Sequence, residues 1–554
     1  MCGITGLFGI NDKAVISKMN DSIKHRGPDD YGYFFGENIS LGSRRLSVID
    51  LKTGKQPIFN ENNSIVIVFN GEIYNFKALR EMLKGHEFRT KTDTEAIVHL
   101  YEEFGLDFVT YLEGMFAFAI YDIPKKKLIL ARDYVGEKPL FYCQTKETLL
   151  FASEMKALFA SGLIKAEFDE QAIKENFIFD KYILDDRTFF KGIKSLLPGT
   201  MLITDSTGKL SFKQFIKKDY SITERNENHI KEKLRSLMSE SVDSMLISDV
   251  TLGTQLSGGI DSSIIAALHR QILGKDAEIH TFTAIDTIES EESRMAKLVA
   301  NEINSIHHEF EFGAEDIVKE LPSFVYHLED IRYGIVYPYF LNKGTKKYAT
   351  VALSGQGADE LFCGYEIFQK IEEYKKQLLE KVKIAQVDDP ERYLEMINSI
   401  KKEVDLLQFE QTRGQLSNFQ LAFVDRLSMA FGVEVRVPFM HRKIVDYANK
   451  IDPALKIRNG EEKYMLRKAF SGLGLPKAII SRKKVAAGLA NTSPKSMPEF
   501  ESYCEKLVKG SKQGKYDIYF KNNPAKKVCF DLLKEIFVER NAVKPVNFSL
   551  TELY

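Results

Sequence analysis

The spacing of hydrophobic and polar residues changes partway along the chain and predicts two kinds of domain. Before residue 215, strand-length apolar segments dominate, at residues 65–69, 115–121, 127–133 and 139–142. Many strands with few helices predict stacked sheets. After residue 250, apolar strands alternate with helical patterns, with strands at residues 278–284, 305–310 and 350–353. That alternation predicts a parallel sheet flanked by helices.

The two predicted domains meet in a polar, lysine-rich stretch at residues 205–228. We place the boundary at about residue 215, which gives domains of residues 2–215 and 216–554. The helix predicted at residues 229–247 keeps its apolar residues on one face. Residues 369–411 are charged and helical, and we interpret them as a solvated helical layer rather than a nucleic-acid surface. The pattern of residues 500–554 predicts helical segments mixed with other structure and a tail of unknown role.

Two Ser-Gly loops follow predicted strands of the second domain. The first, residues 256–263, is a glycine turn that ends in Asp261 and two serines before a helix, and such a helix start suits a phosphate-bearing ligand. The second, residues 354–362, carries Asp359. Loops at the carboxyl ends of parallel strands converge, so Asp261 and Asp359 could share a Mg²⁺ ion. The alternative is that each loop only connects a strand to a helix, with its aspartate as a turn former.

Candidate chemistry in the first domain begins at Cys2. Removal of Met1 would give Cys2 an α-amino group that can accept the thiol proton, so nucleophile and base would stand on one residue. The alternative is a small buried strand residue. Asn70 and Gly71 stand at a strand end and can donate to an oxyanion. Asp93 opens an amphipathic helix and could be only its N-cap.

The composition of the chain limits which partners and which cellular location we expect. The 554 residues carry a formal net charge of -1, which gives no indication of nucleic acid or of an anionic membrane. The five cysteines are scattered without a C-x-x-C pair, which argues against a disulfide framework and a structural zinc site. No apolar run is long enough for a bilayer, and no secretory signal is visible. We expect a cytoplasmic protein.

Four motifs of the first domain agree in order and spacing with one family. They are Cys2-Gly3-Ile4, His25-Arg26-Gly27-Pro28-Asp29, Asn70-Gly71-Glu72-Ile73-Tyr74-Asn75 and Arg132-Asp133-Tyr134-Val135-Gly136. Over roughly residues 2–205 the chain resembles the glutaminase domain of N-terminal-nucleophile amidotransferases, most closely the asparagine synthetase branch. The resemblance implies an αββα sandwich in which Cys2 attacks the side-chain amide of glutamine. It further implies an oxyanion hole of Asn70 and Gly71, with Arg45 on the substrate carboxylate and Glu72 and Asp93 on its ammonium group.

The second domain resembles the ATP-pyrophosphatase domain of the same family as far as Lys484. Besides the two Ser-Gly loops, the matching segments are residues 425–429, 434–439 and 462–467. The resemblance implies an α/β fold like that of the adenine nucleotide α-hydrolases, and activation of a carboxylate as its acyl-adenylate with release of pyrophosphate. It implies that Arg332 and Lys463 neutralise phosphate charge. The ATP-binding residues it implies are Gln255, Leu256, Ser257, Gly258, Gly259, Asp261, Ser262, Ala284, Ser354 and Gly355.

Together the two resemblances imply a glutamine-dependent ligase that uses ATP and Mg²⁺ to amidate aspartate through β-aspartyl-AMP, with ammonia passing inside the protein. A homodimer is a possible assembly. Two residues depart from the usual family pattern: Gln356 replaces an acid between two glycines, and Cys363 replaces a glycine. Gln356 keeps open another carboxylate acceptor, such as a sugar acid or a peptide. A degenerate protein that only binds nucleotide or glutamine is the second alternative, against which the intact Cys2 and Asp261 argue.

Overall fold

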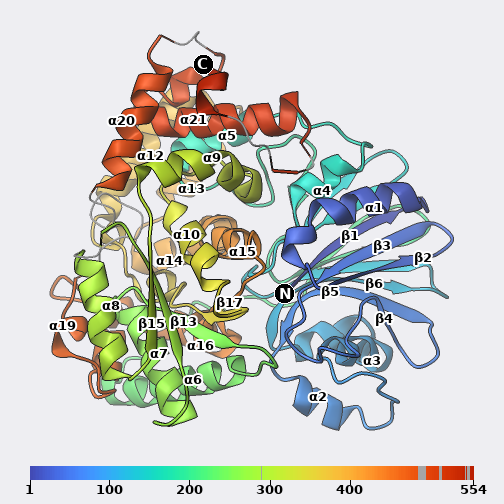
Figure 1. Cartoon of the computed structure of the whole chain (residues 1–554), viewed down its shortest axis with the longest axis horizontal. Coiled ribbons are helices and arrows are strands. Elements are labelled where there is room, and N and C mark those ends of the chain that lie inside the picture. The colour runs from blue at the N-terminus through green and yellow to red at the C-terminus, as the bar shows by residue number, and fades with distance from the viewer. Residues whose placement is uncertain (288–289, 484–494, 511–513, 543, 546–548) are drawn as a thin grey trace.

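A computed structural model describes residues 1–287, 290–483, 495–510, 514–542, 544–545 and 549–554, so Lys484 lies outside the described residues. A layered antiparallel half and a parallel-sheet half lie side by side, with helices above the parallel sheet (Figure 1). Within the described ranges, no helix has the length and apolar character needed to cross a membrane.

The first half contains two antiparallel six-stranded sheets stacked on one another. One has the order β10-β8-β9-β1-β3-β2 and the other β12-β11-β7-β6-β5-β4. The strands of the first sheet are β1 (Cys2–Phe8), β2 (Asp30–Phe35), β3 (Ile39–Arg45), β8 (Phe141–Gln144), β9 (Leu149–Ala152) and β10 (Lys194–Ser195). Those of the second are β4 (Ile58–Phe59), β5 (Ile65–Ile73), β6 (Gly114–Asp122), β7 (Lys127–Arg132), β11 (Thr200–Thr204) and β12 (Ser211–Gln214).

The continuous apolar run of β5 follows from burial on both faces. Successive side chains of a strand point to opposite faces. Val66 and Val68 pack between the two sheets, whereas Ile67 and Phe69 pack against the helical side of their sheet. The outer layers are α1 (Lys13–Ser22) and α4 (Met155–Ala160) on one sheet, and α2 (Phe76–Met82) and α3 (Thr94–Phe104) on the other (Figure 1). The predicted αββα sandwich is confirmed.

The second half is built on a parallel sheet with the order β15-β14-β13-β16-β17. Its strands are β13 (Leu252–Gln255), β14 (His280–Ile285), β15 (Ile306–Glu311), β16 (Val351–Leu353) and β17 (Glu434–Arg436), and every neighbouring pair is parallel. The predicted parallel sheet is confirmed. Its helices are α6 (Glu227–Met245), α7 (Ile260–Leu273), α8 (Glu291–Glu302), α9 (Ala314–Leu328), α10 (Val336–Thr345), α11 (Ala358–Phe362), α15 (Leu421–Met429), α16 (Arg442–Lys450), α17 (Pro453–Lys456), α18 (Tyr464–Phe470) and α19 (Lys477–Ile480).

A helical layer stands at the end of the parallel sheet (Figure 1). It contains α12 (Ile371–Ala385), α13 (Pro390–Asn398), α14 (Glu403–Arg413), α20 (Ser496–Val508) and α21 (Pro524–Leu533), together with α5 (Glu170–Phe179). Helices α12 to α14 confirm the helical prediction for residues 369–411. Helix α5 precedes residue 215 yet packs against α12, so the two halves share this layer. The division at residue 215 stays our proposal.

Candidate active sites

The first candidate site lies where β1 meets β3 and β5. The antiparallel register sets Cys2 opposite Arg45, which places their side chains on the same face. The Cys2 backbone N–H donates to Asn70 Oδ1 at 2.9 Å. Asn70 is fully buried, and its Nδ2 has no hydrogen-bond partner among the described residues. A buried donor without a partner is costly in a resting protein, so this amide is suited to a substrate oxyanion.

The Cys2 thiol lies in a dry environment. Burial raises the pKa of the Cys2 thiol, and the nearby Met1 ammonium and Arg45 guanidinium partly oppose that rise. Gln56 Nε2 lies 3.8 Å from Cys2 Sγ. Its own Oε1 accepts from the Phe69 backbone N–H at 2.7 Å, which fixes the direction of the amide. Sequence reasoning missed Gln56, because only the fold brings it to the thiol.

Glu72 and Asp93 form a pair of buried carboxylates behind Cys2. Burial first, and then the neighbouring Asp93, raise the pKa of Glu72 well above its ordinary value. Burial also raises the pKa of Asp93. Asp93 is the N-cap residue of α3 by position, but its side chain makes no capping hydrogen bond, and its Oδ2 instead accepts from the Ile73 backbone N–H at 2.8 Å. Two buried acids close together favour a bound cation such as a substrate ammonium group.

Arg45 and Met1 complete this site. Arg45 Nη2 donates to the backbone carbonyls of Ile49 at 3.0 Å and Asp50 at 2.7 Å, which anchors one end of the guanidinium. Met1 precedes Cys2 here, and its α-ammonium forms a fully buried ion pair with Glu434. The Met1 ammonium and Arg436 together lower the pKa of Glu434 to about 2. Gly71 allows no side chain, because a Cβ would lie 2.1 Å from the Met115 carbonyl.

The second candidate site is a cavity of about 190 Å³ at the carboxyl ends of β13 and β16. Helix α7 begins beside it at Ile260. Gly258 makes the preceding turn with a φ of +66°, and a Cβ there would lie 2.5 Å from Met295 Cβ. The predicted residues that line the cavity are Gln255, Leu256, Ser257, Gly259, Asp261, Ser262, Ser354, Gly355, Asp359 and Lys463. Gly258 and Ala284 are not among the lining residues.

Two aspartates converge on one buried cation in this cavity. Lys463 Nζ lies 2.6 Å from Asp261 Oδ2 and 2.6 Å from Asp359 Oδ1. The lysine is 1% exposed. Asp261 Oδ1 is buried and has no hydrogen-bond partner among the described residues. Two converging carboxylates and an unoccupied buried carboxylate oxygen are the donor set that Mg²⁺ prefers.

Arg332 does not join this cavity. Its Nη1 donates to the backbone carbonyls of Lys181 at 2.8 Å and Asn418 at 3.2 Å, and its Nη2 pairs with Asp330. It lines a separate cavity between the halves. Besides Lys463, the described cations that line the cavity of the second candidate site are Arg467, Arg482 and Lys483. Sequence reasoning assigned no role to these three, although Arg467 belongs to the matching segment 462–467 and the adjacent basic residues at 482 and 483 were a visible signal.

Gln356 faces the same cavity as an uncharged group. Its Nε2 donates to Gln420 Oε1, and Gln420 Nε2 donates to the Tyr365 hydroxyl at 2.7 Å. The amide is therefore fixed by a chain of hydrogen bonds rather than free to rotate. The position that carries an acid in the usual family pattern contributes no proton acceptor of carboxylate strength here.

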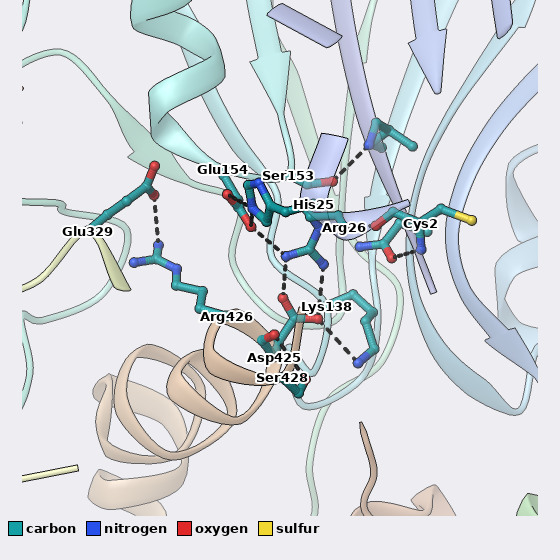
Figure 2. A network of polar contacts seen from close by, with 12 residues as sticks. Cys2, His25, Arg26, Lys138, Ser153, Glu154, Glu329, Asp425, Arg426 and Ser428 are labelled. Carbon is teal, nitrogen blue, oxygen red and sulfur yellow. Dashed lines mark hydrogen bonds and ion pairs between the residues drawn. The ribbon is translucent and has the colours of Figure 1, made fainter. Parts of the chain in front are cut away.

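A buried network of charges joins the two halves (Figure 2). Arg26 Nε donates to the Cys2 carbonyl at 3.0 Å, and Arg26 Nη1 reaches Asp425 at 2.7 Å and Glu154 at 2.9 Å. Lys138 lies 3.4 Å from the same Asp425. The Cys2 backbone is thus one side chain, Arg26, away from Asp425 on α15, and Asp425 lies 399 residues after Arg26 in the sequence.

Helix α15 and strand β17 each face both sites. Val435 lines the nucleotide cavity, whereas its neighbours on the strand point the other way. Arg436 lies 3.5 Å from Glu72, and Glu434 pairs with the Met1 ammonium. Because successive side chains of a strand point to opposite faces, β17 presents Val435 to one candidate site and Glu434 and Arg436 to the other. On α15, Phe423 and Val424 line the cavity while Asp425 faces Arg26.

The fold and the two sites define a glutamine amidotransferase with an N-terminal nucleophile, joined to an ATP-dependent ligase domain. Family profiles agree with this class: the one described as glutamine amidotransferase domain matches residues 1–216, and the one described as asparagine synthase matches residues 233–534. The chain belongs to the family of glutamine-hydrolysing asparagine synthetases.

Relatives of this family resemble the chain over most of its length. Asparagine synthetase 1 (glutamine-hydrolyzing) of Bacillus subtilis is 31% identical over 551 residues, covering 88% of this chain and 86% of its own. Asparagine synthetase B of Escherichia coli is 31% identical and covers 87% of this chain and 81% of its own. Asparagine synthetase 2 of Arabidopsis thaliana is 32% identical, with coverages of 87% and 78%.

Proposed function

We propose that this chain makes asparagine from aspartate and ATP with glutamine as the nitrogen donor. The observation that carries the proposal is β17, because one strand contacts the carboxylates of the glutaminase site and the wall of the nucleotide cavity. A protein that only bound nucleotide or only hydrolysed glutamine would need no such shared strand.

In the first half-reaction the Cys2 thiolate attacks the amide carbon of glutamine. Asn70 Nδ2 donates to the oxyanion that forms, and Gly71 supplies the second donor of the proposed hole. Ammonia leaves, and water hydrolyses the thioester to glutamate. Arg45 holds the substrate carboxylate. The pair of Glu72 and Asp93 holds its ammonium group, which supplies the cation that those buried acids favour.

In the second half-reaction the β-carboxylate of aspartate attacks the α-phosphorus of ATP, and pyrophosphate leaves. Ammonia then attacks the carbonyl carbon of β-aspartyl-AMP, and AMP leaves. Lys463 and Arg467 line the cavity, and we propose that they neutralise the negative charge that develops on the phosphates. We propose Asp261 and Asp359 as ligands of a Mg²⁺ ion, which when bound would neutralise phosphate charge. The buried, unpartnered Asp261 Oδ1 supports this fit.

Ammonia has to remain unprotonated between the sites, because ammonium has no lone pair with which to attack. A continuous apolar core supports a dry route. It contains Met1, Tyr74 and Met115 of the glutaminase half together with Leu256, Ala358 and Met429 of the other half. Water is excluded from such a core, so ammonia that enters it stays neutral.

A product assay tests the proposal. The protein is incubated with glutamine, ATP, Mg²⁺ and aspartate, and asparagine, AMP and pyrophosphate are measured. We expect the three products in equal amounts. Consumption of ATP without asparagine, but with another carboxylic acid present, would favour the second candidate, an amidotransferase for a different acceptor. Gln356 motivates that candidate, since it presents an amide where the usual family pattern has an acid.

Cytoplasmic location and a homodimer also remain proposals. The homodimer rests on the family resemblance. Light scattering of the purified protein tests the homodimer, and a mass of one chain, 63.3 kDa, would contradict it.

A further inference from the structure

Two histidines and two glutamates meet in the glutaminase half, and none of the four belongs to either candidate site. Glu61 lies between β4 and β5, His86 follows α2, and His99 and Glu102 lie on α3. Each contributes one ligand atom, and these atoms all lie within 4.8 Å of one another. His99 and Glu102 are three residues apart on a helix, so they share one face.

The distances fit a tetrahedral ion. A Zn²⁺ ion with bonds of about 2.0–2.1 Å holds its ligand atoms about 3.3 Å apart. Glu61 Oε1 lies 2.9 Å from His86 Nδ1, and Glu61 Oε2 lies 3.2 Å from His99 Nδ1. Glu102 Oε2 lies 3.1 Å from His99 Nδ1 and 3.7 Å from His86 Nδ1. With Oε1 as the one ligand atom of Glu61, three edges of the tetrahedron (2.9, 3.1 and 3.7 Å) lie within about 0.4 Å of that length before any ion is added.

Carboxylates also lie next to the second ring nitrogen of each histidine. A ligating histidine normally has a carboxylate, backbone carbonyl or water at its other ring nitrogen. His86 Nε2 lies 3.0 Å from Glu103 Oε1. His99 has no such hydrogen bond among the described residues: its Nε2 lies 3.9 Å from Glu95 Oε1, and Glu95 is itself held by the backbone N–H of Arg89 at 2.7 Å.

The second oxygen of Glu102 is also occupied. Asn60 Nδ2 donates to Glu102 Oε1 at 2.7 Å, which leaves Oε2 directed at the histidines. Two neutral imidazoles and two carboxylates balance a divalent ion. Side-chain exposure is 0% at His99 and 29% at Glu61, so an ion can enter from the Glu61 side and finish in a mostly dry site.

We propose that Glu61, His86, His99 and Glu102 bind one structural Zn²⁺ ion. Four protein ligands leave no open position, which is the arrangement of structural rather than catalytic zinc. Nitrogen ligands favour zinc over Mg²⁺, which takes oxygen ligands. The ion would join the segment after α2 to α3, whose first turn follows Asp93. It would therefore fix the helix behind the glutamine ammonium site.

Metal titration tests the proposal. The full chain is treated with a chelator and dialysed, Zn²⁺ alone is titrated by calorimetry, and bound zinc is measured by elemental mass spectrometry. We expect one tight equivalent per chain that excess Mg²⁺ does not displace. His86→Gln and Glu102→Gln should each lose that equivalent. The matched control His229→Gln, at an exposed histidine outside the cluster, should keep it.

Two further measurements make the result decisive. Cys2→Ala should retain the equivalent, which excludes the active-site thiol as the ligand. Zn²⁺ should raise the thermal midpoint of the wild type but not of either cluster variant. Zinc binding that is unchanged in both cluster variants, or no tight binding to a folded wild type, would overturn the proposal. Because Glu102 is partly exposed, its variant provides the test if His86→Gln does not fold.

Discussion

Gly364 is the residue whose substitution should separate the two activities most cleanly. It follows α11, close to the contact between Lys463 and Asp359. A Cβ at residue 364 would lie 2.0 Å from Asp359 Oδ1 and 2.3 Å from Lys463 Cε. Because contacts below 3.0 Å are essentially never seen for a Cβ, Gly364→Ala must move the carboxylate by about 1 Å. A displacement of that size in a catalytic arrangement can cost about 100-fold in rate.

We therefore expect Gly364→Ala to lower ammonia-dependent, ATP-consuming synthesis about 100-fold. Glutamine hydrolysis at Cys2 should stay within about twofold of the wild type, because the glutaminase residues are not displaced. The added methyl group overpacks the site and should cost about 1–3 kcal/mol of stability. Pyrophosphate release with ammonium chloride as nitrogen donor measures the first activity, and glutamate release measures the second.

Gly85→Ala is the matched control, since a Cβ at residue 85 meets nothing within 4 Å. It should change neither activity. Synthesis by a folded Gly364→Ala variant within about threefold of the wild type would refute the reasoning, because the pair of Asp359 and Lys463 would then tolerate the displacement. An equal loss of both activities would indicate misfolding rather than a local effect.

Three further predictions concern the glutaminase site and the helical layer. Cys2→Ala should abolish glutamine-dependent synthesis yet retain synthesis from added ammonia, and loss of both in a folded variant would contradict separate sites. Asn70→Ala should lower the kcat of glutamine hydrolysis about 10²–10³-fold, the usual cost of one oxyanion donor; an unchanged kcat would exclude that role. Burial raises the pKa of Glu410 to about 7 in the folded protein. The protonated carboxyl therefore contributes fully to the free energy of unfolding below about pH 4.5, and about 3 kcal/mol of that contribution is lost as the pH rises to 7. Glu410→Gln should therefore reduce the fall in thermal midpoint between pH 5 and pH 8. An unchanged fall would contradict the raised pKa of Glu410.

Much of the fold could be predicted because its signals are local. The apolar run of β5 and the two Ser-Gly loops are contiguous in sequence, and loops at the carboxyl ends of parallel strands must meet at one edge of the sheet. That rule is why the sequence alone predicts that Asp261 and Asp359 lie close together. Their distances of 2.6 Å to Lys463 are what the structure added.

The parts that escaped prediction depend on long-range packing. Nothing near Arg26 in sequence indicates Asp425, and nothing near Cys2 indicates Gln56. Arg332 shows the opposite error: a basic residue in a matching region was assigned to phosphate, but the fold directs it to backbone carbonyls in another cavity. Among the four proposed zinc ligands, only His99 and Glu102 were indicated by the sequence, because they are three residues apart on a predicted helix. The other two, Glu61 and His86, come from separate loops.

The burial of the Met1 ammonium against β17 has a consequence for the order of events during synthesis of the protein. Glu434 emerges from the ribosome more than 400 residues after Met1, and once β17 has packed the Met1 side chain is 0% exposed. An aminopeptidase cannot reach a terminus buried in this way. If Cys2 is to act with a free amine, Met1 therefore has to be removed before the second half packs, on the growing chain. Folded protein that still carries Met1 should keep its mass when incubated with methionine aminopeptidase; a loss of one methionine would contradict this order.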